Sequence, residues 1–290
     1  MTVQKRQSKG ATTRYLLFLT LYALFVAGFV GLRFAWSWLP SDAAVLTQVS
    51  QGLYDEGTIT PSSAAAYWFG YVYPFLNASL AHLTGASIET LQVFVQPFLI
   101  ALLVPLAYAA FRNLTGDHST ALLASSLLFL QPEFLFEAVR SSHAKVTWMM
   151  ALAMVSILAR SLRLPSSGSA LAKLVFLFYL SAFGLIASNS FFASSFIFSI
   201  AFAFLGGRVL WRWWDSKRTA TSRLERLLYV TLSCSTLFFL FLFYLYPPAL
   251  HQLRTLRSVL DRIGLVFLDL EVATNPYAYV QATWLNEWIF

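Results

Sequence analysis

Seven long apolar runs alternate along this sequence with loops whose Lys and Arg residues fall mostly on one side of the chain's path. A helix that crosses a bilayer needs about 20 mainly apolar residues, and positive charge in short loops marks the cytoplasmic side. The runs cover residues 15–38, 91–111, 119–131, 146–159, 171–188, 191–210 and 227–246. They predict an all-α, polytopic membrane protein with about seven transmembrane helices.

The composition fits this class. Hydrophobic residues make up 58% of the chain and charged residues only 11%, whereas about a quarter of a typical soluble domain is charged. A net charge of +7 would suggest nucleic acid for a soluble protein. Positive cytoplasmic loops explain the charge here, so we expect no nucleic-acid partner. The single cysteine, Cys234, excludes an internal disulfide and a CxxC metal site.

Residues 1–14 are basic and are predicted to be cytoplasmic. The apolar run after them is longer than the core of a signal peptide, which is about 7–15 residues, and it ends in the interfacial aromatics Trp36 and Trp38. We therefore expect a retained first helix in an integral protein of the plasma membrane. The predicted organisation is a seven-helix module over 15–247 with an outer loop over 39–90, then an outer-face segment over 248–290.

The charges sort by side in this orientation. All but six of the 20 Lys and Arg residues lie on the cytoplasmic side, whereas most of the 13 acidic residues lie outside. The six exceptions are Arg33, Arg140, Lys145, Arg254, Arg257 and Arg262. They are either ordinary charges of outer loops, where the positive-inside rule is weak, or cations that face an anionic lipid or substrate.

Asp42 stands where the first helix is expected to leave the membrane. Residues 43–54 have helical propensity, with Asp42 placed as their N-cap and Gly57 placed to end the helix. Capping and catalysis both remain open for Asp42, because a carboxylate at a membrane boundary can do both. Asp55 and Glu56 are expected to be solvated surface charges.

A second outer segment joins acidic and basic residues. On a helix, Glu137 and Arg140 are three residues apart and can form a local salt bridge. The alternative is that Arg140, His143 and Lys145 together hold a phosphate, which a guanidinium binds as a fork and an ammonium binds as a point charge.

Two further segments are expected to lie on the membrane surface. The aromatic stretch 67–75 is predicted to form an interfacial helix. Residues 251–267 repeat apolar residues at helical spacing, with Arg254 and Arg257 on the adjacent side, and predict a basic amphipathic helix. Its partner is either anionic lipid in general or the headgroup of a polyprenyl phosphate.

This plan comprises a cytoplasmic N-terminus, a first helix, a long outer loop and six more helices. The residues that carry a family resemblance are Asp42, the stretch Gly52-Leu53-Tyr54-Asp55-Glu56-Gly57 and the later Tyr71-Val72-Tyr73-Pro74. Together they resemble the N-terminal module of the GT-C superfamily, the polytopic glycosyltransferases that use lipid-linked sugars. That superfamily includes oligosaccharyltransferases, protein O-mannosyltransferases and aminoarabinose transferases. The resemblance implies that Asp42 acts as catalytic base or metal ligand.

The chain also departs from that family. Its first outer loop has no Asp-X-Asp pair, and His143 and Lys145 stand where some members place a metal-binding acidic pair. A divalent metal cofactor therefore stays open, since no acidic pair supports it, and no residue is assigned as a metal ligand. The sequence stops at Trp288-Ile289-Phe290, so a truncated chain and a minimal module both remain open.

The first hypothesis is an enzyme that transfers a sugar from a polyprenyl-phosphate donor to an acceptor at the outer face. Asp42 would be the general base, and Arg140, His143, Lys145, Arg254 and Arg257 would stabilise the departing lipid phosphate. The second hypothesis is a non-catalytic GT-C-like scaffold subunit bound to partner membrane proteins. The third is a transporter of lipid-linked sugars, which is disfavoured because the spans contain almost no charge.

Overall fold

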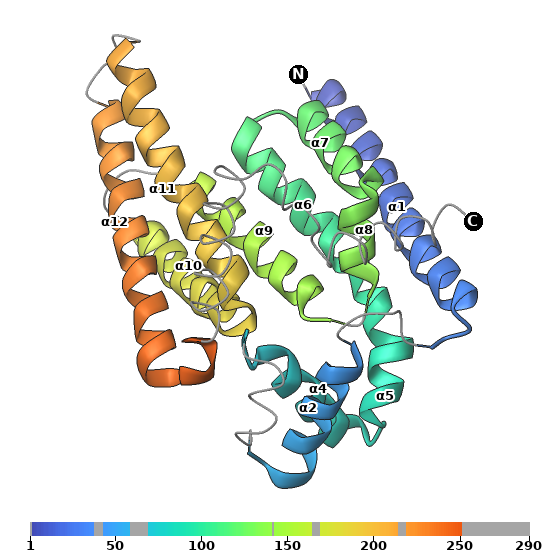
Figure 1. Cartoon of the computed structure of the whole chain (residues 1–290). Helices are drawn as coiled ribbons and strands as arrows, with labels where there is room; N and C mark the ends of the chain where they lie inside the picture. Colours follow the sequence, from blue (N-terminus) through green and yellow to red (C-terminus); the bar gives the residue numbers. More distant parts are fainter. Residues whose placement is uncertain are drawn as a thin grey trace, which may run out of the picture. The chain divides into compact units, whose positions relative to one another are not determined.

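The computed structural model describes residues 2–37, 43–58, 69–140, 142–163, 169–213 and 219–250. The chain forms two compact units, Met1–Ala249 and Leu250–Phe290, and the first contains every α-helix of the described ranges. Regular structure in these ranges is helical throughout (Figure 1). The α-helices are α1 (Thr2–Arg33), α2 (Ala43–Glu56), α4 (Val72–Thr84), α5 (Ile88–Thr90), α6 (Ile100–Thr115), α7 (His118–Leu130), α8 (Pro132–Val139), α9 (Ala144–Ser161), α10 (Ser169–Ser188), α11 (Ser190–Trp213) and α12 (Thr219–Leu240). Two π-helical turns, η1 (Leu91–Val95) and η3 (Phe241–Leu245), and two 3-10 turns, η2 (Gln96–Leu99) and η4 (Pro247–Leu250), complete the described helical structure.

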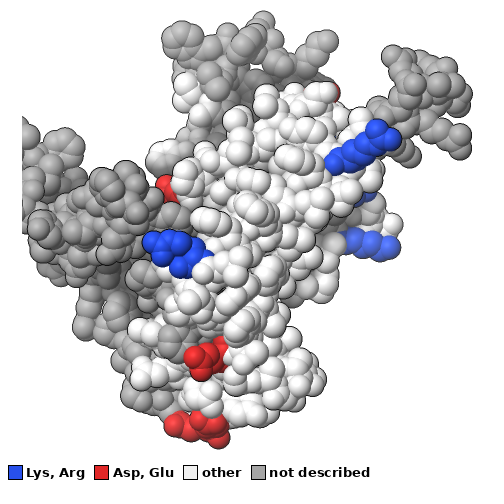
Figure 2. Space-filling model, turned by 90° about the vertical axis from the view of Figure 1, so that its right-hand side faces the viewer, with Lys and Arg blue, Asp and Glu red and all other residues white. Residues whose placement is uncertain are grey.

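Six described helical segments are long and apolar enough to cross a membrane, and a bent pair makes a seventh if it is counted as one span. The six are Gly10–Arg33, Ile88–Thr115, Ala144–Ser161, Ser169–Ser188, Ser190–Val209 and Glu225–Leu245. Their outward faces carry large apolar side chains, including Phe25, Phe202 and Phe239, which are 58–70% exposed. Figure 2 shows uncharged side chains over most of one such face. Exposed apolar surface on this scale fits a lipid environment, so the expected all-α, membrane-spanning class is confirmed.

The predicted span over 119–131 is a bent pair instead of one straight helix. α7 has 13 residues and is therefore about 20 Å long, which is shorter than the hydrocarbon core of about 30 Å. Pro132 begins α8 and pushes the residue before it, Gln131, into an extended conformation with ψ 120°. The axes of α7 and α8 consequently differ by 72°.

The described loops gather at two opposite ends of the helices. At one end, Arg163 Nη2 donates to the Leu114 carbonyl (2.9 Å) and Arg226 Nη1 donates to the Ser161 carbonyl (2.8 Å). These guanidinium groups cap the C-terminal ends of α6 and α9, where helix carbonyls lack partners. The loops at this end of the helices are the ones that the sequence predicts to be cytoplasmic. The predicted outer loops meet at the other end, where the candidate site lies.

Small side chains allow the first half of the unit to pack closely. α6 packs against α1, α7 and α9. Ala23 and Ala27 on α1 and Ala107 on α6 are fully buried in one cluster, together with Phe129 from α7. Close helix approach over small residues is the usual packing mode in membranes, where lipid is as apolar as the helix surface.

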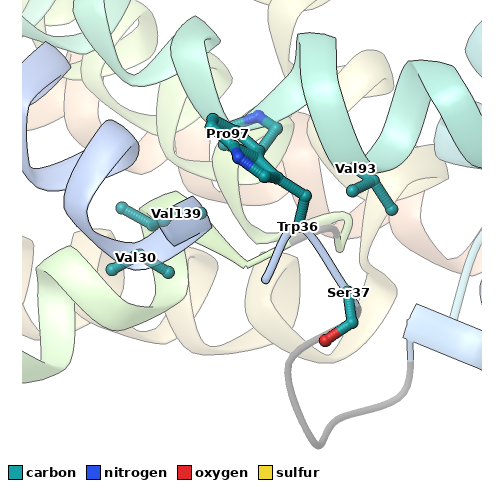
Figure 3. Close-up of a pocket in the computed structure, with 7 residues that line it drawn as sticks. Val30, Trp36, Ser37, Val93, Pro97 and Val139 are labelled. Carbon is teal, nitrogen blue, oxygen red and sulfur yellow. The ribbon is translucent and has the colours of Figure 1, made fainter. Parts of the chain in front are cut away.

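α1 ends in a tight reversal that places Trp36 back on the helix bundle. Ala35 and Trp36 have φ values of 52° and 55°, which are uncommon for residues with a side chain. The Trp36 ring stacks on Phe94 with centroids 5.2 Å apart, and Figure 3 shows the indole reaching toward Pro97. The hollow beside it has a volume of about 20 Å³, which is room for about one water molecule and not for a substrate.

Gly31 leaves the space that Trp36 fills. A Cβ at Gly31 would lie 2.4 Å from the Trp36 ring, so Gly31→Ala is expected to lower the thermal stability of the protein in detergent. In a Trp36→Ala background the clash is absent and the same change should raise stability, because Ala favours a helix over Gly by about 1 kcal/mol. A double-mutant cycle of melting temperatures measures this reversal of sign. If the two substitutions change the melting temperature additively, Gly31 and Trp36 do not pack against each other as described.

Helix α2 confirms the expectation for residues 43–54. It ends beside Gly57, which has φ +69° and donates its N–H to the Leu53 carbonyl (3.0 Å). Asp55 and Glu56 are exposed, as predicted. The expected interfacial helix over 67–75 is helical only from Val72 in its described part, because residues 69–71 are not helical. Tyr73 is only 1% exposed, and the position of this helix at the membrane interface stays a prediction. α4 packs against α2 (Figure 1).

Candidate functional site

Three predicted phosphate-binding residues, Arg140, His143 and Lys145, lie together where α8 passes into α9. Arg140 is the first residue after α8, and its Nε lies 3.2 Å from Glu137 Oε2. The predicted local salt bridge is therefore confirmed. The guanidinium also lies over the Phe136 ring, 5.6 Å from the centroid, and Nε donates to Ser142 Oγ (3.1 Å). These contacts fix Arg140 beside the start of α9.

Lys145 is the second residue of α9 and is fully buried. Its Nζ donates to the Arg140 carbonyl at 2.8 Å. An ammonium carries three donors, and no carboxylate in the described ranges lies within ion-pair distance of Nζ. The sequence predicts that Lys145 lies in the outer loop. It also predicts that the spans contain almost no charge. The structure places Lys145 in the first turn of α9, at the end of the candidate span Ala144–Ser161.

His143 is held between an aromatic ring and an amide. The ring stacks on Phe69 with centroids 6.5 Å apart, and its Nε2 lies 2.5 Å from Asn189 Nδ2. The side chain is 93% buried, since 7% of it is exposed. Burial, with a smaller contribution from the Arg140 charge, lowers the pKa of His143 from 6.5 to about 3. The imidazole is therefore neutral at physiological pH.

The outer-loop segment 69–71 is joined to the turn between α10 and α11 through backbone atoms. Tyr71 N donates to the Ala187 carbonyl and Ser190 N donates to the Phe69 carbonyl, both at 2.8 Å. A Cβ on Gly70 would lie 2.2 Å from the Ala187 oxygen. Only glycine allows this close approach of the two chains. We call the residues 69–71, 140, 142–145 and 187–190 the junction.

An aromatic cluster covers one side of the junction. Tyr71 stacks on Phe241 (centroids 6.0 Å apart) and meets Tyr246 edge to face (5.6 Å). Burial raises the pKa of Tyr71, and it raises the pKa of Tyr246 to about 12. Both phenols are therefore neutral at physiological pH. The cluster ties the segment 69–71 to the π-helical end of α12.

The structure thus brings together three of the six predicted site residues. Asp42, Arg254 and Arg257 lie outside the described residues, and their roles stay predictions. Within the described ranges no three His, Cys, Asp or Glu side chains converge as metal ligands. Phosphate binding by His143 stays a prediction, and the buried, neutral ring would take part as a hydrogen-bonding group and not as a charge. Its partner Asn189 was not predicted, although an Asn just before an apolar run is a recognisable N-cap signal.

Comparison with known proteins assigns no family to this arrangement. No family model matches the chain, and neither a curated protein nor a solved structure is detectably similar to it.

Proposed function

We propose that this chain is a membrane glycosyltransferase that moves a sugar from a polyprenyl-phosphate donor to an acceptor at the extracytoplasmic face. The observation that carries the proposal is Lys145, whose side chain is fully buried at the end of a candidate span. It lies beside the guanidinium-bearing Arg140 and has no carboxylate partner among the described residues.

An anionic ligand would stabilise the charged form of this buried lysine. Removing an ion from water costs several kcal/mol unless a counter-charge and hydrogen bonds compensate. Charged side chains within membrane helices are rare and commonly mark substrate pathways. Arg140 and Lys145 offer a fork and a point charge, which are the two groups that proteins use to bind phosphate.

A lipid phosphate suits both the chemistry and the place. At the end of the helices it would sit at headgroup depth, with its polyprenyl chain along the exposed apolar helix faces. In sugar transfer the leaving phosphate gains negative charge, and fixed cations at that atom lower the barrier. Asp42 is proposed as the base that deprotonates the acceptor hydroxyl. Arg254 and Arg257 are proposed as further headgroup contacts.

Lys145→Met is expected to weaken the binding of a polyprenyl phosphate by roughly 10- to 100-fold, since a hydrogen bond to a charged group contributes about 1.5–3 kcal/mol. Native mass spectrometry of the detergent-purified protein measures bound lipid against polyprenol, which has the same chain without the phosphate. Lys173→Met is the matched control, because Lys173 is exposed on α10. Melting temperatures of the three proteins show whether folding is intact.

Two results would overturn the proposal. One is equal binding of polyprenol and polyprenyl phosphate to the wild-type protein. The other is unchanged phosphate-lipid binding in Lys145→Met. A membrane protein that co-purifies in fixed ratio, with no bound phosphate lipid, would favour the non-catalytic scaffold instead.

A further inference from the structure

The orientation of the Asn189 side-chain amide follows from its place before α11. Asn189 Oδ1 accepts the backbone N–H of Phe192 at 3.0 Å, which is the usual contact of a helix N-cap. A backbone N–H can only donate. The amide oxygen therefore faces Phe192, and the NH₂ group is the part of Asn189 that faces His143.

This orientation determines where the His143 ring carries its proton. The Asn189 NH₂ group can only donate, so the facing atom, His143 Nε2, must present a lone pair. A protonated imidazolium would oppose two N–H groups at this short distance. The remaining state is the neutral ring with its proton on Nδ1.

The surroundings of His143 favour the same state. The titratable groups on the neighbouring elements are Arg140 at the end of α8, Lys145 on α9 and Tyr71 on the segment 69–71. Arg140 disfavours a second positive charge on the ring, and Glu137 is paired with Arg140. The turn from Ala187 to Ser190 contributes no titratable side chain.

We propose that Asn189 is a positioning residue that holds His143 as a neutral imidazole with its proton on Nδ1. His143 then meets a phosphate as a neutral hydrogen-bond donor and not as a third cation. This deepens the proposed function and, for the phosphate contact, rests on it. A neutral donor adds a hydrogen bond while avoiding further repulsion among Arg140, Lys145 and the ring.

Asn189→Asp reverses the hydrogen-bond polarity without removing the helix cap. Asp and Asn are equally good N-caps, so α11 should still begin at the same place. The new carboxylate can only accept from His143, so it favours an Nε2–H and stabilises the imidazolium. Asn189→Ala removes both interactions and serves as the control for loss of the cap.

Nitrogen NMR of the histidine-labelled protein distinguishes protonated from unprotonated ring nitrogens. Of the four histidines, the signal of His143 is the one that disappears in His143→Gln. In the wild type we expect a protonated Nδ1 and a bare Nε2, unchanged from pH 5 to pH 8. In Asn189→Asp we expect a protonated Nε2 and a ring that titrates in this range. A wild-type ring with Nε2–H, or one that titrates near pH 6.5, would overturn the proposal.

The same variants separate this inference from the proposed function, because the tautomer is measured without lipid. His143→Gln, which removes the ring donor, should bind polyprenyl phosphate about tenfold more weakly. Unchanged lipid binding in this variant would overturn the phosphate contact of His143. If the tautomer is as expected but the wild type binds no polyprenyl phosphate, the positioning role of Asn189 stands and the proposed function fails.

Discussion

Replacing Asp42 by Asn is expected to lower the rate of sugar transfer by about 10²- to 10⁴-fold while leaving the amount of folded protein unchanged. The amide keeps the shape of the side chain but has no basic oxygen, and a positioned general base contributes a factor of this size. Release of polyprenyl phosphate from a panel of polyprenyl-phosphate sugars, followed by mass spectrometry, measures the rate. Because every donor in the panel releases the same lipid, the readout does not depend on which sugar is transferred.

Asp55→Asn is the matched control for this change. Asp55 lies in the same outer loop and is exposed, and its carboxylate accepts from Gln51 Nε2 on the same helix at 3.0 and 3.1 Å. Its conversion to an amide should leave the rate within error of the wild type. Transfer at the wild-type rate in Asp42→Asn would remove Asp42 from the mechanism. Equal losses in both variants would point to a general effect of loop charge.

The helices were predictable because their signal is local. A run of apolar residues long enough to span lipid specifies a helix whatever its neighbours are, and each of the seven runs contains one. The prediction is weakest where the run is short. Residues 119–131 are too few for a straight span, and Pro132 converts the remainder into a second helix at a sharp angle.

Tertiary packing in the outer loop could not be predicted from local patterns. Aromatic residues such as Tyr73 favour a membrane interface, but the same side chain fills the space between α2 and α4, where it is buried with Leu46 and Val49. Lys145 shows the same limit. A lysine at the edge of an apolar run is expected to reach water, and only the folded backbone of Arg140 places an acceptor that keeps it inside.

The candidate site was predictable to the extent that its contacts are short in sequence. Arg140 and Glu137 are three residues apart, and helical spacing is enough to pair them. The contact of His143 with Asn189 spans 46 residues, and that of Ser190 with Phe69 spans 121. No periodicity links such positions in one sequence. The burial that keeps His143 neutral depends in part on such distant contacts, so the residue types alone do not show its protonation state.

Gly70→Ala is expected to detach the segment 69–71 from the turn between α10 and α11. The added Cβ would lie 2.2 Å from the Ala187 oxygen and 2.6 Å from the Ser188 oxygen. Both are backbone atoms, so no side-chain rotation relieves the clash. Overpacking of this kind costs about 1–3 kcal/mol and occasionally more. The change should also break the hydrogen bonds from Tyr71 N and Ser190 N, each 2.8 Å long in the wild type.

Hydrogen exchange and melting temperature in detergent together locate this damage. We expect faster exchange at Tyr71 and Ser190 and a lower melting temperature, with little change in α1 or α7. Gly52→Ala is the matched control, since a Cβ there meets nothing within 4 Å and Ala favours the α2 helix by about 1 kcal/mol. The same substitution should therefore stabilise at one glycine and destabilise at the other. Equal protection of Tyr71 in both variants would show that the segment does not approach the turn closely enough to require glycine. In that case the stacking of Phe69 on His143 would also lose its structural basis, because the segment that carries Phe69 would not be held against the turn.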